Sequence, residues 1–184
     1  LGGLEILRKN WESAKKEIHS WKNISNNSIS IEVIPCCVDT DLFNPSIIDQ
    51  QKKNKIRCDL GINKSEFILS YLGTIGTWYL LDEMLFFFKL LLKKKQNSKF
   101  LFITQEDKGK IFFSADNFAI PCDKIIIHSA KRKDVPSLLA LSTMSIFFIK
   151  PSFSKKASSP TKYGEIMSMG IPVICNSGIG DIDC

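Results

Sequence analysis

The most constraining feature of the sequence is a regular alternation of strand-like and helix-like segments that begins at Phe67. Residues 67–72 form a nearly all-apolar run that ends at Gly73, as strands buried on both faces of a parallel sheet do. A helical pattern follows over residues 80–94, with apolar residues three or four positions apart. Because strand–helix–strand units form right-handed crossovers, this alternation predicts an α/β fold with a doubly wound, Rossmann-like parallel sheet.

The rest of the chain extends this pattern. Downstream we expect four more strands and two more helices: strands at 99–104, 124–128, 145–149 and 172–175, and helices at 136–142 and 161–169. Upstream we expect a helix over 4–21, a short strand over 29–35 and a helix over 47–58 that is stopped by Gly61. Phe86, Phe87 and Leu90 fall off the apolar stripe of the 80–94 helix and predict a second packing face.

The charge and the cysteines restrict the partners only loosely. The net charge of +6 suits a partner with phosphates or an anionic membrane surface, but lysines that merely keep the protein soluble would give the same total.

The six cysteines include no C-x-x-C pair, and His19 and His128 are far apart, so we expect no metal site. A disulfide framework stays open, although the lack of a signal-like start favours free thiols in the cytoplasm. No apolar run is long enough to span a bilayer.

Ligands of doubly wound sheets bind beyond the carboxyl ends of the strands, so the loops that follow strands matter most. The first is Gly73-Thr74-Ile75-Gly76. Its glycines let the backbone approach a ligand closely, and the helix start behind it offers N–H groups and partial positive charge to a phosphate. It matches neither G-x-G-x-x-G nor a Walker loop, so a plain tight turn fits it as well.

The second loop covers residues 150–162 and holds four serines and three lysines before Lys162. Ser159 is predicted to cap the next helix, with Pro160 at its first position. Cations and hydroxyls at a helix start are what a diphosphate requires, although a solvated basic loop is the alternative. Glu165 lies four residues after Thr161 on the same helix face. Its carboxylate could accept both hydroxyls of a ribose, or simply favour the helix dipole.

Together these residues resemble the C-terminal domain of group 1 glycosyltransferases of family 4, which have the GT-B fold. Four segments carry the resemblance: V-I-P-C-C-V-D at 33–39 with Phe43 and Pro45, S-Y-L-G-T-I-G at 70–76, V-P-S-L-L-A at 135–140, and S-S-P-T-K-Y-G-E-I-M-S-M-G-I-P-V-I at 158–174. The last segment is the most specific.

The resemblance implies a retaining glycosyltransferase that moves a sugar from a nucleoside-diphosphate sugar to a glycan or lipid-linked acceptor. It implies no cofactor and no metal, because a helix start and basic side chains offset the diphosphate charge. By position, Glu165 would hold the ribose, and Ser129, Ala130 and Lys131 the base. The diphosphate or sugar would contact the remaining site residues: Gly73, Thr74, Ile75, Gly76, Lys150, Ser158, Ser159, Thr161 and Lys162.

The sequence departs from the family pattern at one point. Many members carry two glutamates with seven residues between them, and the first falls at Ala157 here. The resemblance also implies that residues 1–30 are a remnant of an N-terminal acceptor domain or a linker helix. Residues 31–184 would then be the nucleotide-sugar-binding domain, incomplete at its C-terminus. We therefore expect the chain to be cytoplasmic, with the acceptor domain and a peripheral contact at the inner membrane face as partners, and to bind a nucleotide weakly without turnover.

Two other functions remain open on the sequence. A non-hydrolysing nucleotide-sugar epimerase of GT-B type would share the fold and the donor but transfer nothing. A non-catalytic basic module would bind anions with steep salt dependence and little regard for the nucleotide. A dinucleotide oxidoreductase is disfavoured because the glycine fingerprint is missing. Basic residues do not interleave with aromatic ones, so we expect no nucleic acid partner.

Overall fold

The computed structural model describes residues 36–180 and 182, and they fall in two compact units. The larger unit comprises residues 37–150 and 160–176. The described part of the smaller unit comprises residues 36, 151–159, 177–180 and 182. The helix expected over 4–21, the strand expected over 29–35 and the domain boundary near residue 30 lie outside the described residues, so they stay predictions.

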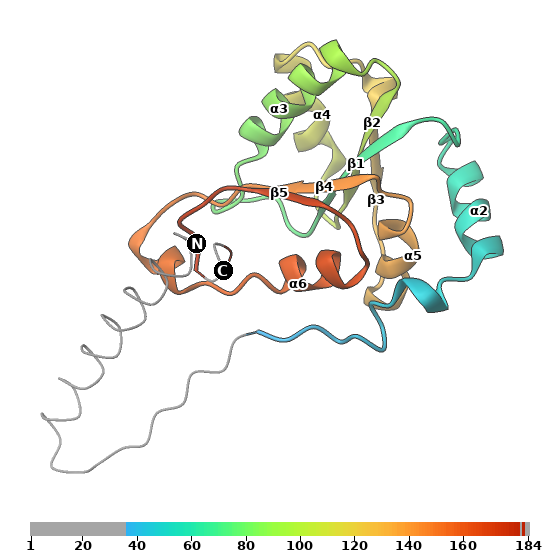
Figure 1. Ribbon diagram of the computed structural model, residues 1–184. Coiled ribbons are helices and arrows are strands. Elements are labelled where there is room, and N and C mark those ends of the chain that lie inside the picture. Colours follow the sequence, from blue (N-terminus) through green and yellow to red (C-terminus); the bar gives the residue numbers. More distant parts are fainter. Residues whose placement is uncertain (1–35, 181, 183–184) are drawn as a thin grey trace, which may run out of the picture. The chain divides into compact units, whose positions relative to one another are not determined.

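The larger unit is built on a five-stranded parallel sheet with the order β3-β2-β1-β4-β5 (Figure 1). All five strands fall where the sequence predicts them, within one or two residues: β1 (Phe67–Leu72), β2 (Ser98–Ile103), β3 (Ile125–His128), β4 (Met144–Phe147) and β5 (Val173–Cys175). The expected doubly wound, Rossmann-like α/β class is thereby confirmed. Strand β4 ends earlier than expected because Ile149 forms an antiparallel bridge with Tyr79 instead of continuing the parallel ladder.

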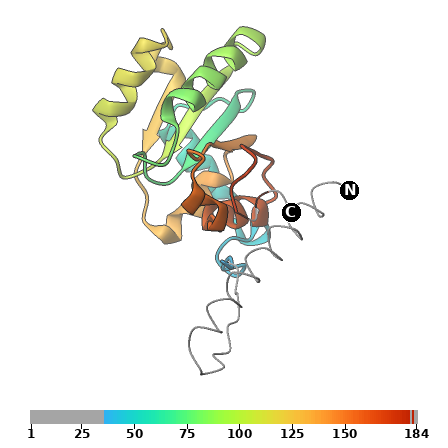
Figure 2. The ribbon, with the colours of Figure 1, turned by 90° about the vertical axis from the view of Figure 1, so that its left-hand side faces the viewer.

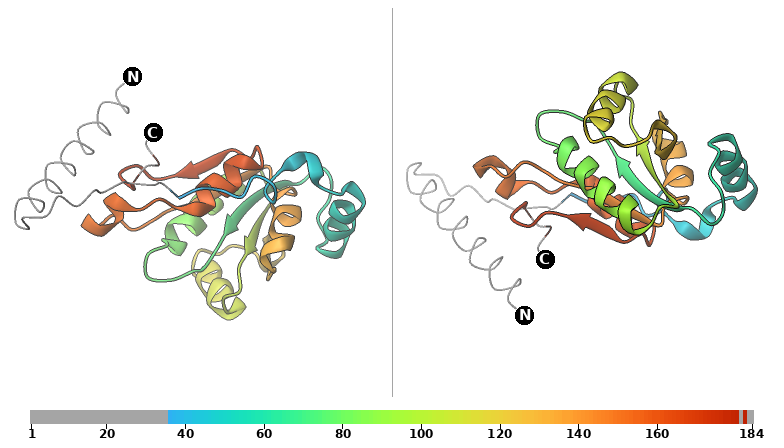
Figure 3. Two further views of the ribbon diagram at one scale, coloured as in Figure 1. Left: turned by 90° about the horizontal axis from the view of Figure 1, so that it is seen from below. Right: turned by 90° about the horizontal axis from the view of Figure 1, so that it is seen from above.

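Helices cover both faces of this sheet (Figures 2 and 3). Helices α3 (Leu81–Lys94) and α4 (Lys108–Asn117) pack together on one face. Helices α5 (Val135–Leu139) and α6 (Thr161–Ser168) lie on the other face, where α2 (Gln50–Asp59) packs against α5. Short 3-10 turns complete the connections: η1 (Pro45–Ile47), η2 (Cys122–Lys124), η3 (Arg132–Asp134) and, in the smaller unit, η4 (Phe153–Ala157). No helix in the described ranges is long and apolar enough to cross a bilayer.

Helix α5 ends at Leu139 rather than at residue 142, because the N–H groups of Leu141 and Ser142 donate to the carbonyls of Leu138 and Leu139, three residues back, as in a 3-10 turn.

Two other helices differ from expectation, and each begins with a side-chain cap. Helix α2 begins at Gln50 rather than at residue 47, because the Asp49 carboxylate accepts hydrogen bonds from the N–H groups of Gln51 and Lys52. Helix α4 was not predicted at all, since its first turn contains Gly109 and its apolar periodicity is weak. The overlooked signal was Asp107, whose carboxylate accepts from the N–H of Gly109 at 2.9 Å.

The predicted cap of α6 was wrong. Pro160 takes the N-cap position and the helix starts at Thr161, and no side chain of the described residues caps it. Within the smaller unit, the hydroxyl of Ser159 accepts a hydrogen bond from the N–H of Cys36 at 3.1 Å. The first amides of α6 therefore keep the unsatisfied donors and partial positive charge that a helix start carries.

The core lies where α3 meets the central strands. Phe88, Phe100 and Phe102 are fully buried, and the rings of Phe100 and Phe102 lie with centroids 4.1 Å apart. Of the residues expected to form a second face on α3, Phe86 and Leu90 are about half exposed, and the Phe86 ring contacts Phe118 of the connection after α4.

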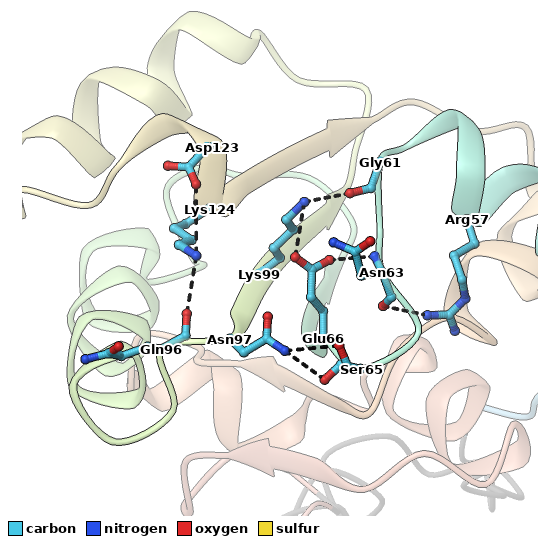
Figure 4. Close-up of polar contacts among 10 residues, drawn as sticks. All are labelled: Arg57, Gly61, Asn63, Ser65, Glu66, Gln96, Asn97, Lys99, Asp123 and Lys124. Carbon is cyan, nitrogen blue, oxygen red and sulfur yellow. Dashed lines mark hydrogen bonds and ion pairs between the residues drawn. The ribbon is translucent and has the colours of Figure 1, made fainter.

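Polar contacts stabilise the amino edge of the sheet, which is the side where the parallel strands begin (Figure 4). The Lys99 ammonium donates to the carbonyl of Gly61 at 2.7 Å and lies 3.5 Å from the Glu66 carboxylate. Nearby, Lys124 donates to the carbonyl of Gln96 at 3.3 Å. A cavity of about 310 Å³ adjoins this edge, and Lys124, Lys89 and Lys93 are among its lining residues. Lys99 and Lys124 thus stabilise the fold by bonding to the backbone of neighbouring loops.

Candidate functional site

The topology places the candidate site at the carboxyl ends of β1 and β4. The chain leaves β1 toward β2 and leaves β4 toward β5, so the strand order reverses between these two neighbours. A crevice opens at such a switch point, and this is where doubly wound folds bind ligands. The loop that starts at Gly73 follows β1, and α6 lies on the connection that follows β4.

Gly73 and Lys162 meet at this point. Gly73 has a φ of 120°, a conformation that side-chain-bearing residues rarely adopt. A Cβ atom at Gly73 would lie only 2.6 Å from Nζ of Lys162. The lysine therefore fills the space that the missing side chain leaves. The structure thus brings together the two segments that the sequence analysis assigned to the diphosphate.

The Lys162 ammonium is buried in an aromatic cage. The residue is 8% exposed, and Nζ lies 3.6 Å from the ring centroid of Tyr79, 4.7 Å from that of Tyr71 and 5.9 Å from that of Phe147. Ring faces attract a cation, but buried lysines are normally paired with an acid. No carboxylate among the described residues lies within ion-pair distance of Nζ, so the ammonium has no direct acidic partner, and the charge of Glu165 acts on it only from farther away.

The Tyr71 hydroxyl connects this cage to the glycine loop. It donates a hydrogen bond to the carbonyl oxygen of Thr74 and accepts one from Nζ of Lys162 at 3.4 Å. Burial raises the pKa of Tyr71, so the phenol keeps its proton and remains a donor to the loop. Loop conformation and lysine position are thereby linked through one side chain.

The charge of Lys162 is expected to depend on pH near neutrality. Burial lowers the pKa of Lys162 from 10.5 to about 7, and the negative charge of Glu165 opposes this shift. In the folded protein the amine therefore loses its proton above about pH 7. The unfolded chain keeps that proton up to about 10.5.

This shift predicts how ligand binding and stability respond to pH. A diphosphate pairs with the protonated amine, so its affinity should fall above pH 7, by up to about tenfold per pH unit, with proton uptake on binding. Without ligand, the free energy of unfolding should rise between pH 7 and 10.5, because the unfolded chain then binds the extra proton. Calorimetry in buffers of different ionisation enthalpy measures the uptake, and Lys162→Met should abolish it. An uptake that persists in this variant would assign the proton to another group.

Glu165 is buried and forms an ion pair that sequence reasoning missed. Arg132 Nη1 donates to Oε1 of Glu165 at 2.7 Å, and the carboxylate-bearing side chain is only 9% exposed. Arg132 belongs to η3, directly after Ser129, Ala130 and Lys131. The two partners are 33 residues apart, so no local pattern links them. The one feature of the sequence that could have suggested this pair is that Arg132 directly follows the loop expected to hold the base.

The remaining predicted residues are placed as follows. Ser129 and Lys131 are exposed at the end of β3, and the carbonyl of Ala130 accepts from Gln105 at 3.3 Å. Lys150 is exposed, and its N–H donates to the carbonyl of Trp78 at 2.8 Å. Thr74, Gly76 and Thr161 are exposed, and Ile75 is half-buried. Ala157, Ser158 and Ser159 belong to the smaller unit, so their contribution to the site stays a prediction.

Comparison with known proteins identifies the fold. No protein-family model and no curated protein matches the sequence. Solved structures do match. WaaG, a glycosyltransferase involved in lipopolysaccharide biosynthesis, aligns with a TM-score of 0.60 and 15% identity over 82% of this chain. A glycosyltransferase from Rickettsia africae ESF-5 aligns with a TM-score of 0.58 and 18% identity over 89% of the chain. The C-terminal domain of LpcC, a group 1 glycosyltransferase from Francisella tularensis, aligns with a TM-score of 0.53 and 19% identity over 75%.

These alignments also show which part of the larger proteins is matched. The chain covers 39% of WaaG and 43% of the Rickettsia protein, but 69% of the isolated LpcC domain. The match is therefore to less than half of each of the two longer proteins and to most of the LpcC C-terminal domain. The described part of this chain has the Rossmann-like fold of the C-terminal half of group 1 glycosyltransferases, which are GT-B enzymes.

Proposed function

We propose that this chain is the donor-binding half of a retaining glycosyltransferase that takes a sugar from a nucleoside-diphosphate sugar. The observation that carries the proposal is the buried ammonium of Lys162, which lacks an acidic partner within 4.0 Å among the described residues and lies against Gly73 at the start of α6. A pyrophosphate bound at this point would supply a direct negatively charged partner.

The start of α6 adds to the attraction of Lys162. The amides of Thr161 and Lys162 open the helix, and within the part of the chain that the structure describes no side chain caps it. Helix N-termini bind phosphates through such N–H groups and through the helix dipole. Together with the ammonium they would stabilise the negative charge that develops on the leaving diphosphate when the sugar departs. This arrangement requires no metal ion for charge neutralisation.

Glu165 lies one helical turn after Thr161 and would bind the ribose. It is buried, and Arg132 engages only one of its two oxygens among the described contacts. The free acceptor positions suit the ribose hydroxyls. Ser129, Ala130 and Lys131 follow β3 at the same edge of the sheet and would contact the base.

The biological setting follows from the proposed chemistry. We propose a cytoplasmic enzyme of polysaccharide or lipopolysaccharide biosynthesis that acts on a glycan or lipid-linked acceptor, with a peripheral contact at the anionic inner face of the membrane. WaaG is described as taking part in lipopolysaccharide biosynthesis. The acceptor would bind the other half of the two-domain fold, so we expect the chain alone to bind a donor without transferring the sugar.

A thermal-shift screen tests the proposal. Uridine, guanosine and adenosine diphosphates and their sugars should be compared at millimolar concentration. We expect selective stabilisation by one base, because a ligand at 100 times its Kd stabilises by about 2.7 kcal/mol. Glu165→Ala should weaken binding by about tenfold to hundredfold, since a hydrogen bond to a charged group contributes about 1.5–3 kcal/mol. Glu83→Ala, which removes an exposed acid on α3, is the matched control.

Other outcomes of the screen would favour the other functions. Equal stabilisation by all three bases, lost steeply with added salt, would indicate a basic anion-binding module. In a separate assay of the donor without an acceptor, conversion to an epimeric nucleotide sugar would indicate a non-hydrolysing epimerase of GT-B type. No shift with any nucleotide would contradict donor binding by this chain.

A further inference from the structure

The ion pair between Arg132 and Glu165 is asymmetric in its burial. The Glu165 side chain is 9% exposed and that of Arg132 is 63% exposed. An exposed arginine normally samples many rotamers, and most exposed ion pairs are weak for this reason. A bond of 2.7 Å from such a residue to a buried acid therefore requires something that fixes the guanidinium.

Phe43 provides that fixation. The Arg132 guanidinium carbon lies 5.3 Å from the ring centroid of Phe43, which is itself 1% exposed. A planar guanidinium stacks well on an aromatic face. The Phe43 carbonyl accepts a hydrogen bond from the hydroxyl of Ser168 at 2.6 Å, and its N–H donates to the carbonyl of Asp39 at 2.9 Å. The ring therefore has a fixed position relative to α6.

These contacts start and end on the same helix, α6. Ser168 and Glu165 are both on this helix, three residues apart. Ser168 holds Phe43, Phe43 supports Arg132, and Arg132 holds Oε1 of Glu165. This series of contacts fixes the carboxylate of Glu165 in one orientation and leaves its Oε2 without a hydrogen bond from Arg132.

We propose that Arg132 is a positioning residue that orients Glu165 for the ribose hydroxyls and fixes the place of Glu165 relative to the loop assigned to the base. The inference rests on the proposed function, because it assumes that Glu165 binds the ribose. Arg132 directly follows Lys131, the last residue of the loop assigned to the base. One side chain thereby connects the part of the site that holds the base with the part that holds the sugar of the nucleoside.

The test compares ribonucleotide and dideoxyribonucleotide binding. The nucleoside diphosphate that binds best in the screen and its 2′,3′-dideoxy analogue, which lacks both hydroxyls that Glu165 would bind, should be titrated into the 184-residue chain. The unmodified chain should prefer the ribonucleotide by about tenfold or more, as a hydroxyl bound to a charged acceptor does. Arg132→Ala should weaken ribonucleotide binding to nearly the dideoxy level while dideoxynucleotide binding changes little. Arg132→Lys should recover part of the preference for the ribonucleotide, because lysine restores the positive charge but lacks the planar guanidinium that stacks on Phe43.

Controls separate positioning from charge and from folding. Lys133→Ala removes the same charge from an exposed neighbour and should keep the preference for ribose. Arg132→Gln serves as a second neutral variant if the alanine variant unfolds, and melting curves check both. An unmodified chain without ribose preference would overturn the proposed ribose contact and this inference with it. A ribose preference that survives in the Arg132 variants, or a loss of both analogues by the same factor, would overturn this inference alone.

Discussion

Replacement of Lys162 by methionine is expected to weaken nucleoside diphosphate binding by about tenfold to hundredfold without lowering the thermal midpoint. The binding loss corresponds to one charge-assisted hydrogen bond of about 1.5–3 kcal/mol. Stability should hold or increase, because methionine fills a similar volume and burying an ammonium without an acidic partner is costly. The aromatic cage of Tyr71, Tyr79 and Phe147 accepts a thioether readily.

The expected loss of affinity without a loss of stability makes the experiment decisive. A purely structural lysine would lower stability when removed and would not affect a ligand specifically. Lys93→Met, at an exposed position on α3, is the matched control and should leave both quantities unchanged. Calorimetric titration gives the affinities and scanning calorimetry gives the midpoints. An unchanged affinity in the Lys162 variant would remove the main support for the diphosphate site.

Replacement of Gly73 by alanine is expected to lower both stability and nucleotide affinity. The φ of 120° is unfavourable for alanine, and such strain costs about 1–3 kcal/mol. The new Cβ would also meet Nζ of Lys162, so the lysine must leave its position. We expect the loss of affinity to approach that of Lys162→Met, because both changes remove the ammonium from the site.

A second glycine separates these two causes. Gly61 also has a positive φ, of 60°, but no atom lies within 4 Å of where its Cβ would be. Gly61→Ala should therefore lower stability through backbone strain alone and leave nucleotide binding intact. If the Gly73 variant bound nucleotide as tightly as the unmodified chain, the contact between the glycine loop and Lys162 would have no role in binding.

The sheet could be predicted from the sequence because its signals are local. Residues 67–72 are apolar on both faces, and this pattern alone fixed the bounds of β1. Helix α4 was missed because Gly109 and its polar residues weaken the periodicity that marks a helix. The cap of α6 was misplaced because serine before proline is a common cap pattern, whereas the contact that occupies Ser159 comes from Cys36, far away in the sequence.

The binding roles of the candidate site residues stay predictions, and the contacts among these residues could not be predicted from the sequence. Gly73, Lys162 and Glu165 were predicted to bind the donor, and the structure places Gly73 against Lys162. The cage around Lys162 could not be foreseen, since Tyr71 and Phe147 read as ordinary strand residues. The Arg132–Glu165 pair also depends on how β3 and α6 are placed in the fold. Contacts between distant segments leave no periodic pattern in a sequence.

The central claim is that the start of α6 and the glycine loop together bind a pyrophosphate. Amide NMR spectra recorded during titration with the nucleoside diphosphate selected by the screen test it most directly. We expect saturable shifts that are largest at Gly73–Gly76, Thr161 and Lys162 and that are absent in Lys162→Met. Shifts centred instead on the amino-edge cavity near Lys89, Lys93 and Lys124, or spread over the surface without saturation, would contradict it.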